Sequence, residues 1–552
     1  MGKAYSDSEP AVTYTYDQSA NGVGLRTSMT DAAGSESWTY DLMGRVVTDQ
    51  RTTNGVTKTT SYVYNQDGTL ASVTYPSGRV VSYLIGGAEL PLSATDSGSG
   101  VNYASGATYA PQGALATAAL GANINLTQSY SSRLQPSAIQ AASASGTDLL
   151  DLAYEFGLGT ADNGDVKAIV NNRDNTRTLY FSYDGLNRIA LANTQASSGA
   201  NAWGQAFGYD PWGNLTSITV TQGSAPALSI AVNSNNQLAG APYSYDAAGN
   251  MLTDAVNTYT WNTEGKMATV NSSLYGSETY TYDGDGRRVM KRTAGKLYWY
   301  GTDGNVLAES DLSGNITDEH IFFDGKRIAR VDSQGNVDYY LTDALGSARV
   351  VAGANGNILD DCDFLPFGDE RCVTSSSGNN YKFTGKERDP ESQLDHFSAR
   401  NYSSQYGRFV SPDWSSKPSP VPYASLGNPQ TLNLYAYVVD NPLRQMDPDG
   451  HGMWDAFKDF FKNPWGDGEP TIPQQEQAQQ QKAAVGYGET SGLLPEKAAN
   501  APKHASPYNP STWDPKSAQQ LQDARENIMD VSQRNGAVHR ATPGSNSIDQ
   551  EI

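Results

Sequence analysis

The chain has 552 residues, of which 18% are charged, and a formal net charge of −21 at pH 7. This negative charge argues against a surface that binds nucleic acid or an anionic membrane. Tyr (33) far outnumbers Phe (13) and Gly reaches 54, a mixture typical of β-sheets joined by many tight turns. Composition therefore predicts an all-β protein. The sequence contains no apolar run of about 18 residues, so we expect no transmembrane helix.

The N-terminal stretch "MGKAYSDSEP" leads directly into strand-like sequence and lacks the charged and apolar regions of a signal peptide. We therefore expect this chain to be a piece of a longer protein, with further parts of the fold supplied by the missing N-terminal sequence.

A short unit recurs along the first 300 residues: an aromatic residue with Asp or Asn, a few residues, usually Gly, then a polar and an apolar residue. The copies are YDLMGRV (40–46), YNQDGTL (64–70), YDGLNRI (183–189), YDPWGNL (209–215), YDAAGNM (245–251), YDGDGRR (282–288) and the variant WNTEGKM (261–267). Each copy predicts a hairpin turn, because Asp or Asn bonds to the turn backbone and Gly adopts positive φ. Hairpins placed side by side bury a face that one hairpin cannot, so the repeat predicts a continuous sheet.

Residues 85–150 lack clear copies of the unit and are rich in Gly, Ser and Ala. We interpret this stretch as a divergent part of the same sheet; the alternative is a separate domain.

The recurring unit resembles the YD repeat of the RHS (rearrangement hotspot) family, which is also found in teneurins and in the C components of insecticidal toxin complexes. The family's associated core segment is similar to "YYLTDALGSARVV" (339–351), "FLPFGDE" (364–370), "YKFTGKERDPESQLDHFSARNYSSQYGRFVSPDW" (381–414) and "NLYAYVVDNPLRQMDPDG" (433–450). The resemblance covers about residues 10–450. It implies a spiral of hairpins that forms part of a hollow shell, closed at one end by the core segment. We therefore predict a repeat shell over 1–334, a core over 335–451 and a variable cargo region over 452–552.

The resemblance also implies self-cleavage just past the final Asp-Pro-x-Gly. By motif, the aspartyl pair falls on Asp413 and Asp447 and the supporting arginine on Arg400, with the cut between His451 and Gly452. Two carboxylates forced close together cannot both ionise easily, so such a pair can supply an acid and a base.

The sequence departs from the family pattern at three points. Asp413 is followed by Trp-Ser-Ser instead of Pro-x-Gly, its separation from Asp447 is longer than usual, and His451 stands where the family has Leu. The alternative interpretation is that both Asp residues only shape turns, since Asp-Pro-Asp-Gly is a turn signal in any protein.

The cargo region has a different character from the repeats. A Gln-rich linker is expected at 474–482, and helical sequence at 483–552 predicts a small α-rich tail. The stretch "AAVGYGETSGLLPE" (483–496) resembles cell-wall hydrolases related to spore-cortex lytic enzymes, which implies that Glu489 is a general acid in peptidoglycan cleavage. The alternative is a solvated Glu at the start of a helix.

Three classes of function are compatible with these patterns. The first is a secreted or cell-surface toxin shell that encloses and releases its own C-terminal effector in competition between bacteria. Its partners would be the missing N-terminal shell or delivery proteins and an immunity protein. The second is a non-catalytic surface protein that binds partners or carbohydrate, and the third is a partial peptidoglycan hydrolase that uses Glu489.

Neither a metal nor a cofactor is expected. His320 and His396 lie in strand-like sequence without metal-ligand spacing, so we interpret both as structural. Cys362 and Cys372 could pair across a hairpin, but two cysteines leave the redox compartment open.

Overall fold

The computed structural model describes residues 1–5, 9–157, 162–413 and 429–451 and the backbone of 454–455. The chain divides into two compact units, residues 1–487 and residues 488–552, and every described residue belongs to the first. The predicted α-rich tail with its Gln-rich linker lies outside the described residues. The domain boundaries at 334 and 451 remain predictions.

The first sheet has twenty strands, and each pairs antiparallel with the next one along the chain. This order is the meander expected of successive hairpins. The strands are β1 (Gly2–Lys3), β2 (Val12–Tyr16), β3 (Arg26–Asp31), β4 (Gly34–Tyr40), β5 (Val46–Thr53), β6 (Val56–Tyr64), β7 (Leu70–Thr74), β8 (Val80–Ile85), β9 (Pro91–Asp96), β10 (Asn102–Tyr109), β11 (Leu115–Leu120), β12 (Ile124–Tyr130), β13 (Pro136–Ser143), β14 (Asp148–Glu155), β15 (Ala168–Asn171), β16 (Leu179–Tyr183), β17 (Ile189–Thr194), β18 (Trp203–Tyr209), β19 (Leu215–Gly223) and β20 (Leu228–Ser229). A 3-10 turn, η2 (Asn175–Arg177), interrupts the run between β15 and β16.

A second antiparallel meander has fourteen strands. These are β23 (Ser244–Tyr245), β24 (Met251–Thr253), β25 (Asn257–Trp261), β26 (Met267–Ser272), β27 (Gly276–Tyr282), β28 (Arg288–Lys291), β29 (Lys296–Tyr300), β30 (Val306–Asp311), β31 (Ile316–Phe323), β32 (Lys326–Asp332), β33 (Val337–Thr342), β34 (Ala348–Gly353), β35 (Ile358–Phe364) and β36 (Glu370–Ser375). A small pair, β21 (Ala231–Val232) and β22 (Leu238–Ala239), lies between the two meanders in the sequence. The all-β prediction is confirmed for the described residues.

The Gly-, Ser- and Ala-rich stretch at 85–150 forms strands β9–β14 of the first sheet. This confirms that it continues the repeat array, although its turns have lost the recognisable motif. Small side chains do not prevent pairing there, because alternate positions along β11 and β13 are still buried.

The recurring motif folds as a capped turn, as the first copy shows. Asp41 Oδ1 accepts hydrogen bonds from the backbone N–H groups of Met43 (2.8 Å) and Arg45 (3.0 Å). Arg45 Nε donates to Asp41 Oδ2 at 2.7 Å, and Gly44 has a φ of +77°, which favours glycine. The turn is therefore held by residues of the motif itself.

The tyrosine of each motif connects one hairpin to the preceding one. The Arg45 guanidinium lies 4.6 Å from the centre of the Tyr64 ring, and the Tyr64 hydroxyl donates to Val46 O at 3.0 Å. The same hydroxyl-to-carbonyl bond joins Tyr130 to Leu115, Tyr183 to Val166, Tyr209 to Ile189, Tyr282 to Met267 and Tyr300 to Arg288. A phenol spans this gap with a polar end, whereas phenylalanine could not, which explains the excess of Tyr.

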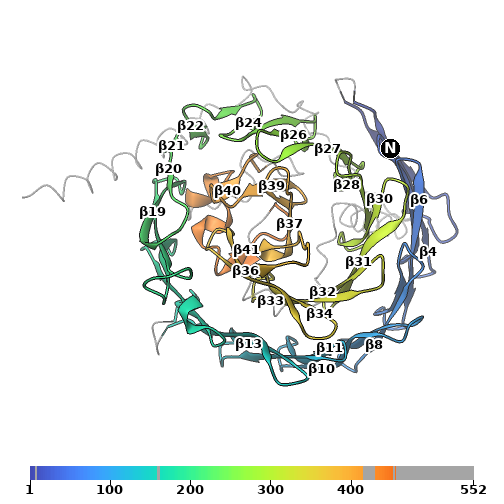
Figure 1. Ribbon diagram of the computed structural model, residues 1–552. Helices are drawn as coiled ribbons and strands as arrows, with labels where there is room; N and C mark the ends of the chain where they lie inside the picture. Colours follow the sequence, from blue (N-terminus) through green and yellow to red (C-terminus); the bar gives the residue numbers. More distant parts are fainter. Residues whose placement is uncertain (6–8, 158–161, 414–428, 452–453, 456–552) are drawn as a thin grey trace, which may run out of the picture. The chain divides into compact units, whose positions relative to one another are not determined.

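The two meanders pack face to face over part of their length. One buried apolar cluster contains residues from both, from Tyr62 in β6 to Ile218 in β19 and from Leu307 in β30 to Phe367 just after β35. The Tyr75 hydroxyl donates to His320 O at 3.0 Å across this contact. Figure 1 shows β30–β34 on the inner side of the curve followed by β4–β13.

The segment after β36 folds against the inner face of the second meander. It contains β37 (Glu387–Arg388), β38 (Asp395–Phe397), β39 (Arg400–Ser403), β40 (Arg408–Phe409), β41 (Gln445–Met446), β42 (Trp454–Asp455) and the short helical turns η3 (Phe383–Gly385), η4 (Pro429–Leu432) and η5 (Val438–Asp440). Its aromatic centre is buried and comprises Phe383, Phe397, Tyr402, Phe409 and Tyr437, which pack together with Phe364 of β35. Figure 1 places β37, β39 and β40 inside the curve followed by β20–β34.

Cys362 and Cys372 face each other across β35 and β36 and form a disulfide. Within the described part of the chain, no helix has the length and apolar character needed to cross a membrane.

Candidate functional site

The structure brings Arg400, Asp413 and Asp447 together in the buried centre of the segment after β36. A single guanidinium nitrogen, Arg400 Nη2, lies 3.2 Å from Asp413 Oδ2 and 3.3 Å from Asp447 Oδ2. The three residues are 6%, 8% and 2% exposed. Solvent therefore screens this charge cluster only weakly.

Asp447 opens the last described turn, and its other oxygen holds that turn closed. Asp447 Oδ1 accepts the backbone N–H of Gly450 at 2.7 Å and that of Asp449 at 3.3 Å. Gly450 has a φ of +89°, and a Cβ at this position would lie 2.5 Å from Phe397 O, so only glycine fits. The Gly450 carbonyl in turn accepts a hydrogen bond from Arg400 Nε. Asp447 thus fixes the backbone just before the predicted scissile bond.

Arg400 is anchored by the strand that carries it and by its surroundings. Its guanidinium lies 3.6 Å from the centre of the Phe409 ring in β40. Its Nη1 donates to Leu434 O at 3.0 Å, and the same carbonyl accepts the Asp413 N–H at 2.9 Å. Burial lowers the pKa of Arg400 from its ordinary value, and Asp413 and Asp447 oppose that shift. The two carboxylates therefore offset part of the cost of burying this charge.

An unusual backbone segment precedes the Asp447 turn. Val438, Val439 and Asp440 have φ values of +44°, +48° and +61°, a left-handed run that β-branched residues rarely adopt. Buried contacts compensate for this conformation, since Val438 is 1% exposed and the Asn441 amide donates to Asp165 Oδ1 at 2.9 Å. This anchor ties the segment to the first sheet.

His451, the last residue before the predicted cut, contacts Asp413 of the aspartyl pair directly. Its Nδ1 lies 3.1 Å from Asp413 Oδ1, and its backbone N–H donates to Asp449 Oδ1 at 3.0 Å. The position where the family has Leu is thus occupied by a side chain that can hydrogen-bond to Asp413. Gly452 and Glu489 lie outside the described residues.

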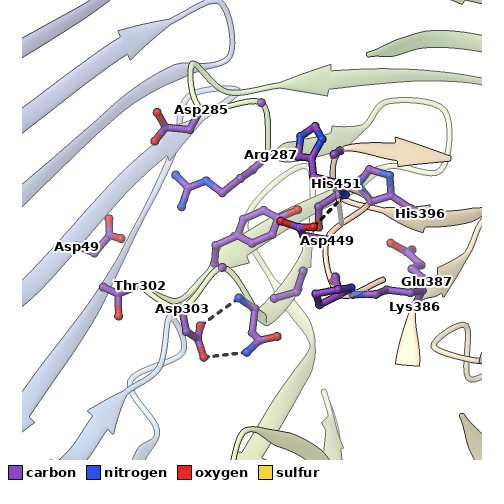
Figure 2. Close-up of a pocket in the computed structure, with 18 of the residues that line it drawn as sticks. Asp49, Asp285, Arg287, Thr302, Asp303, Lys386, Glu387, His396, Asp449 and His451 are labelled. Carbon is purple, nitrogen blue, oxygen red and sulfur yellow. Dashed lines mark hydrogen bonds between the residues drawn. The ribbon is translucent and has the colours of Figure 1, made fainter. Parts of the chain in front are cut away.

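A cavity of about 390 Å³ adjoins this turn, and Asp449 and His451 form part of its lining. The rest of the lining comes from the first sheet, the second sheet and β37–β38, and Figure 2 shows Lys386, Glu387, His396, Asp449 and His451 gathered on one side. Lys386 Nζ donates to Pro448 O, which connects the cavity wall to the Asp447 turn.

Among the described residues, the two histidines interpreted as structural have no carboxylate closer than 3.5 Å. His320 Nε2 lies at that distance from Glu309 Oε1 and packs edge-on against Tyr381, and burial lowers the pKa of His320. His396 Nδ1 lies 3.3 Å from Asn401 Oδ1, and burial lowers the pKa of His396 well below its ordinary value.

Sequence reasoning missed the contribution of Lys386, Phe409 and the His451 imidazole. No local signal identifies the first two, because their contacts depend on how β37 and β40 pack against the final turn. His451 could have been found, since a polar residue replaces Leu directly beside the expected cut.

Antiparallel hairpin meanders linked by motif tyrosines, with a buried Arg-Asp-Asp cluster after the last strand, define a YD-repeat shell protein. The family described as Teneurin YD-shell matches residues 164–443, more than half of the chain, and the chain belongs to this family.

Curated relatives include proteins named as tRNA nucleases and proteins named as teneurins. The tRNA nuclease WapA of Bacillus subtilis is 30% identical over 260 residues, which cover 45% of this chain and 11% of that protein. Teneurin-3 of Danio rerio is 23% identical over 304 residues, covering 49% of this chain and 11% of that protein. The chain therefore spans only about a tenth of the length of these relatives.

Solved structures share the fold at low sequence identity. The crystal structure of TcdB2-TccC3 aligns with a TM-score of 0.66 and 19% identity, covering 81% of this chain and 26% of that chain. The Tc holotoxin pore of Photorhabdus luminescens aligns equally well, with a TM-score of 0.66 over 83% of this chain and 26% of that chain.

Proposed function

We propose that this chain is part of a secreted RHS-repeat shell that encloses its own C-terminal polypeptide and cuts it free between His451 and Gly452. The observation that carries the proposal is the bridging of Asp413 and Asp447 by one nitrogen of Arg400, at 3.2 and 3.3 Å. A carboxylate that only shapes a turn has no need to share an arginine with a second buried carboxylate.

The proposed chemistry is hydrolysis of one peptide bond. Water adds to the His451 carbonyl carbon, the bond to the Gly452 nitrogen breaks, and that nitrogen takes up a proton. One carboxylate of the pair accepts the proton of the attacking water and the other supplies the proton to the leaving nitrogen. Arg400 stabilises the negative charge that develops on the His451 oxygen, since its Nε already binds the neighbouring Gly450 carbonyl.

The comparisons favour the toxin class over a surface-binding module. WapA proteins are named as tRNA nucleases, and the structural neighbours belong to a toxin complex. By this analogy, residues 452–552 would be the effector, the missing N-terminal shell and delivery proteins would be partners, and an immunity protein would protect the producing cell.

The test is a denaturing gel of the full chain. The wild type is expected to run as two fragments, 1–451 and 452–552, whereas Asp447→Ala runs as one band because the acid–base pair is broken. Mass spectrometry of the larger fragment locates the cut at His451.

The matched control is Asp332→Ala. Asp332 opens an Asp-x-x-Gly turn in β32–β33, and its partners are the local residues Gln334 and Asn336. This variant should cleave like the wild type. A single uncut band for the wild type would remove self-cleavage from the function of this chain.

A further inference from the structure

Three cationic side chains in the cavity beside His451 have no carboxylate partner. Lys266, Arg327 and Lys386 line the cavity, and among the described residues none lies within 4.0 Å of a carboxylate oxygen. Their polar contacts are backbone carbonyls: Lys266 donates to Ser398 and Ala399, Arg327 to Gly385 and Lys386 to Pro448. Each therefore retains donors that no acidic group occupies.

The other cations of the cavity are neutralised. Arg26 lies 2.7 Å from Asp285 Oδ2, and Arg287 lies 2.7 Å from Asp283 Oδ2. The three unpaired cations are thus distinct from the rest of the lining, and ordinary salt bridges between the sheets do not account for them.

The acidic residues of the lining are mostly engaged elsewhere. Glu387 is held by Arg288 at 2.8 Å, and Asp303 accepts hydrogen bonds from Asn305. Burial raises the pKa of Asp49, which favours its neutral form. Asp449 also lines the cavity, and it accepts the His451 N–H.

The three unpaired cations have an electrostatic cost in the intact chain. Burial lowers the pKa of Lys266 to about 8, although Glu264, Asp283 and Asp449 oppose the shift. Burial also lowers the pKa of Lys386, although Asp447 and Asp449 oppose that shift. A buried ammonium group without a counterion is unfavourable, so the cavity would be stabilised by an added anion.

The position of the final turn indicates which anion this is. Lys386 holds the Pro448 carbonyl, and His451 lies three positions further along the chain, a span of at most about 10 Å. Figure 2 shows His451 and Lys386 on the same side of the cavity. A group formed at the end of residue 451 therefore appears within reach of these cations.

We infer that the cavity is a binding site for the α-carboxylate of His451, formed when the chain is cut, with Lys386 and Lys266 as its principal ligands and Arg327 as a third. The inference rests on the proposed self-cleavage. Hydrolysis breaks the bond from the His451 carbon to the Gly452 nitrogen and places the water oxygen on His451. Loss of the acid proton at neutral pH then leaves one negative charge beside the unpaired cations.

Such a site would retain the cut end of the shell in the core after the reaction. The new ion pairs stabilise only the cleaved state, so they also oppose re-formation of the peptide bond. The cleaved shell is therefore expected to be more stable than the intact shell, relative to variants without these lysines.

The test compares Lys386→Met in two backgrounds, the cleaved wild type and the uncleaved Asp413→Asn chain. In each, the thermal unfolding midpoint of the full chain is measured with and without the substitution. Loss of the Lys386 hydrogen bond to Pro448 affects both backgrounds and cancels. We expect an additional loss of about 2 °C in the cleaved protein.

A second readout is the titration of ¹³C-methylated lysines by NMR. The Lys386 and Lys266 signals, assigned with Lys386→Arg and Lys266→Arg, should titrate about one pH unit higher in the cleaved protein than in Asp413→Asn. Lys167→Met is the control, because Lys167 lies over the Tyr183 ring and away from the cavity. Lys167→Met should lower the thermal unfolding midpoint by the same amount in both backgrounds.

The outcomes separate the two proposals. In one outcome, the wild type is cut while Lys386→Met lowers the unfolding midpoint equally in both backgrounds and the lysine titrations stay unchanged. That result overturns the carboxylate site alone. A wild type that remains uncut overturns both proposals.

Discussion

The turn at Asp41 and the turn at Asp447 use the same local hydrogen bonds to the backbone. They differ in which arginine binds the second oxygen of the aspartate. Both Asp residues accept backbone N–H groups of their own turn. In the repeat, the second oxygen of Asp41 binds Arg45 of the same motif, with both side chains partly exposed. In the final turn, the second oxygen of Asp447 binds Arg400, 47 residues away and shared with Asp413.

This difference shows how a structural unit can acquire chemistry. A local partner closes a turn and leaves the carboxylate no other role. A distant, buried partner that also holds a second carboxylate creates a site that depends on the whole fold. The contrast predicts different consequences for removing each partner.

The largest effect is expected for Arg400→Met. Two buried carboxylates would lose their shared cation, which should abolish self-cleavage and lower the free energy of unfolding by about 3–5 kcal/mol. A gel and urea unfolding measure the two quantities. Near-wild-type cleavage in this variant would contradict the proposed role of Arg400.

An intermediate effect is expected at Asp324, a turn residue that forms no ion pair within the described part of the chain. Burial raises the pKa of Asp324 from 3.8 to about 6, and its Oδ1 has no hydrogen-bond partner. Because the folded state holds this proton more tightly, stability falls as pH rises from about 4 to 6 and the penalty is complete above 6.

Replacing Asp324 by Asn should therefore stabilise the protein by about 2 kcal/mol at pH 7, and the gain should vanish below about pH 4. Asn also tolerates the left-handed backbone at this position. Urea unfolding across this pH range provides the measurement. A gain that is independent of pH would place its cause outside the carboxyl group.

The smallest effect is expected for Arg45→Met. This arginine is partly exposed, so its ion pair and its contact with Tyr64 should contribute about 1 kcal/mol or less. Thermal unfolding should show a small loss, and cleavage should be unchanged. A loss as large as that of Arg400→Met would erase the distinction between the two turns.

The sequence was sufficient for features whose contacts are local. The turn at Asp41 could be predicted because its partners lie within five positions, and the meander follows from repeating it. The packing of one sheet on the other could not be predicted, since contacts such as that of Tyr75 with His320 join residues far apart in the chain.

The candidate site was predictable only through resemblance to a family. Residue chemistry alone allowed Asp413 and Asp447 to be simple turn residues, and nothing local links either to Arg400. The contact of His451 with Asp413 and the unpaired Lys386 depend on packing in three dimensions, which the motifs do not encode.

The left-handed run at 438–440 bears on the order of assembly. Three such residues in succession are unfavourable in a free chain. We therefore expect this backbone conformation to form only when Tyr437 and Val438 can be buried against structure that has already folded. The Asp447 turn follows this run and can reach Arg400 only afterwards. Self-cleavage would then begin only after residues 437–440 have packed into the core segment. During refolding, the cut should therefore appear later than the burial of Tyr437.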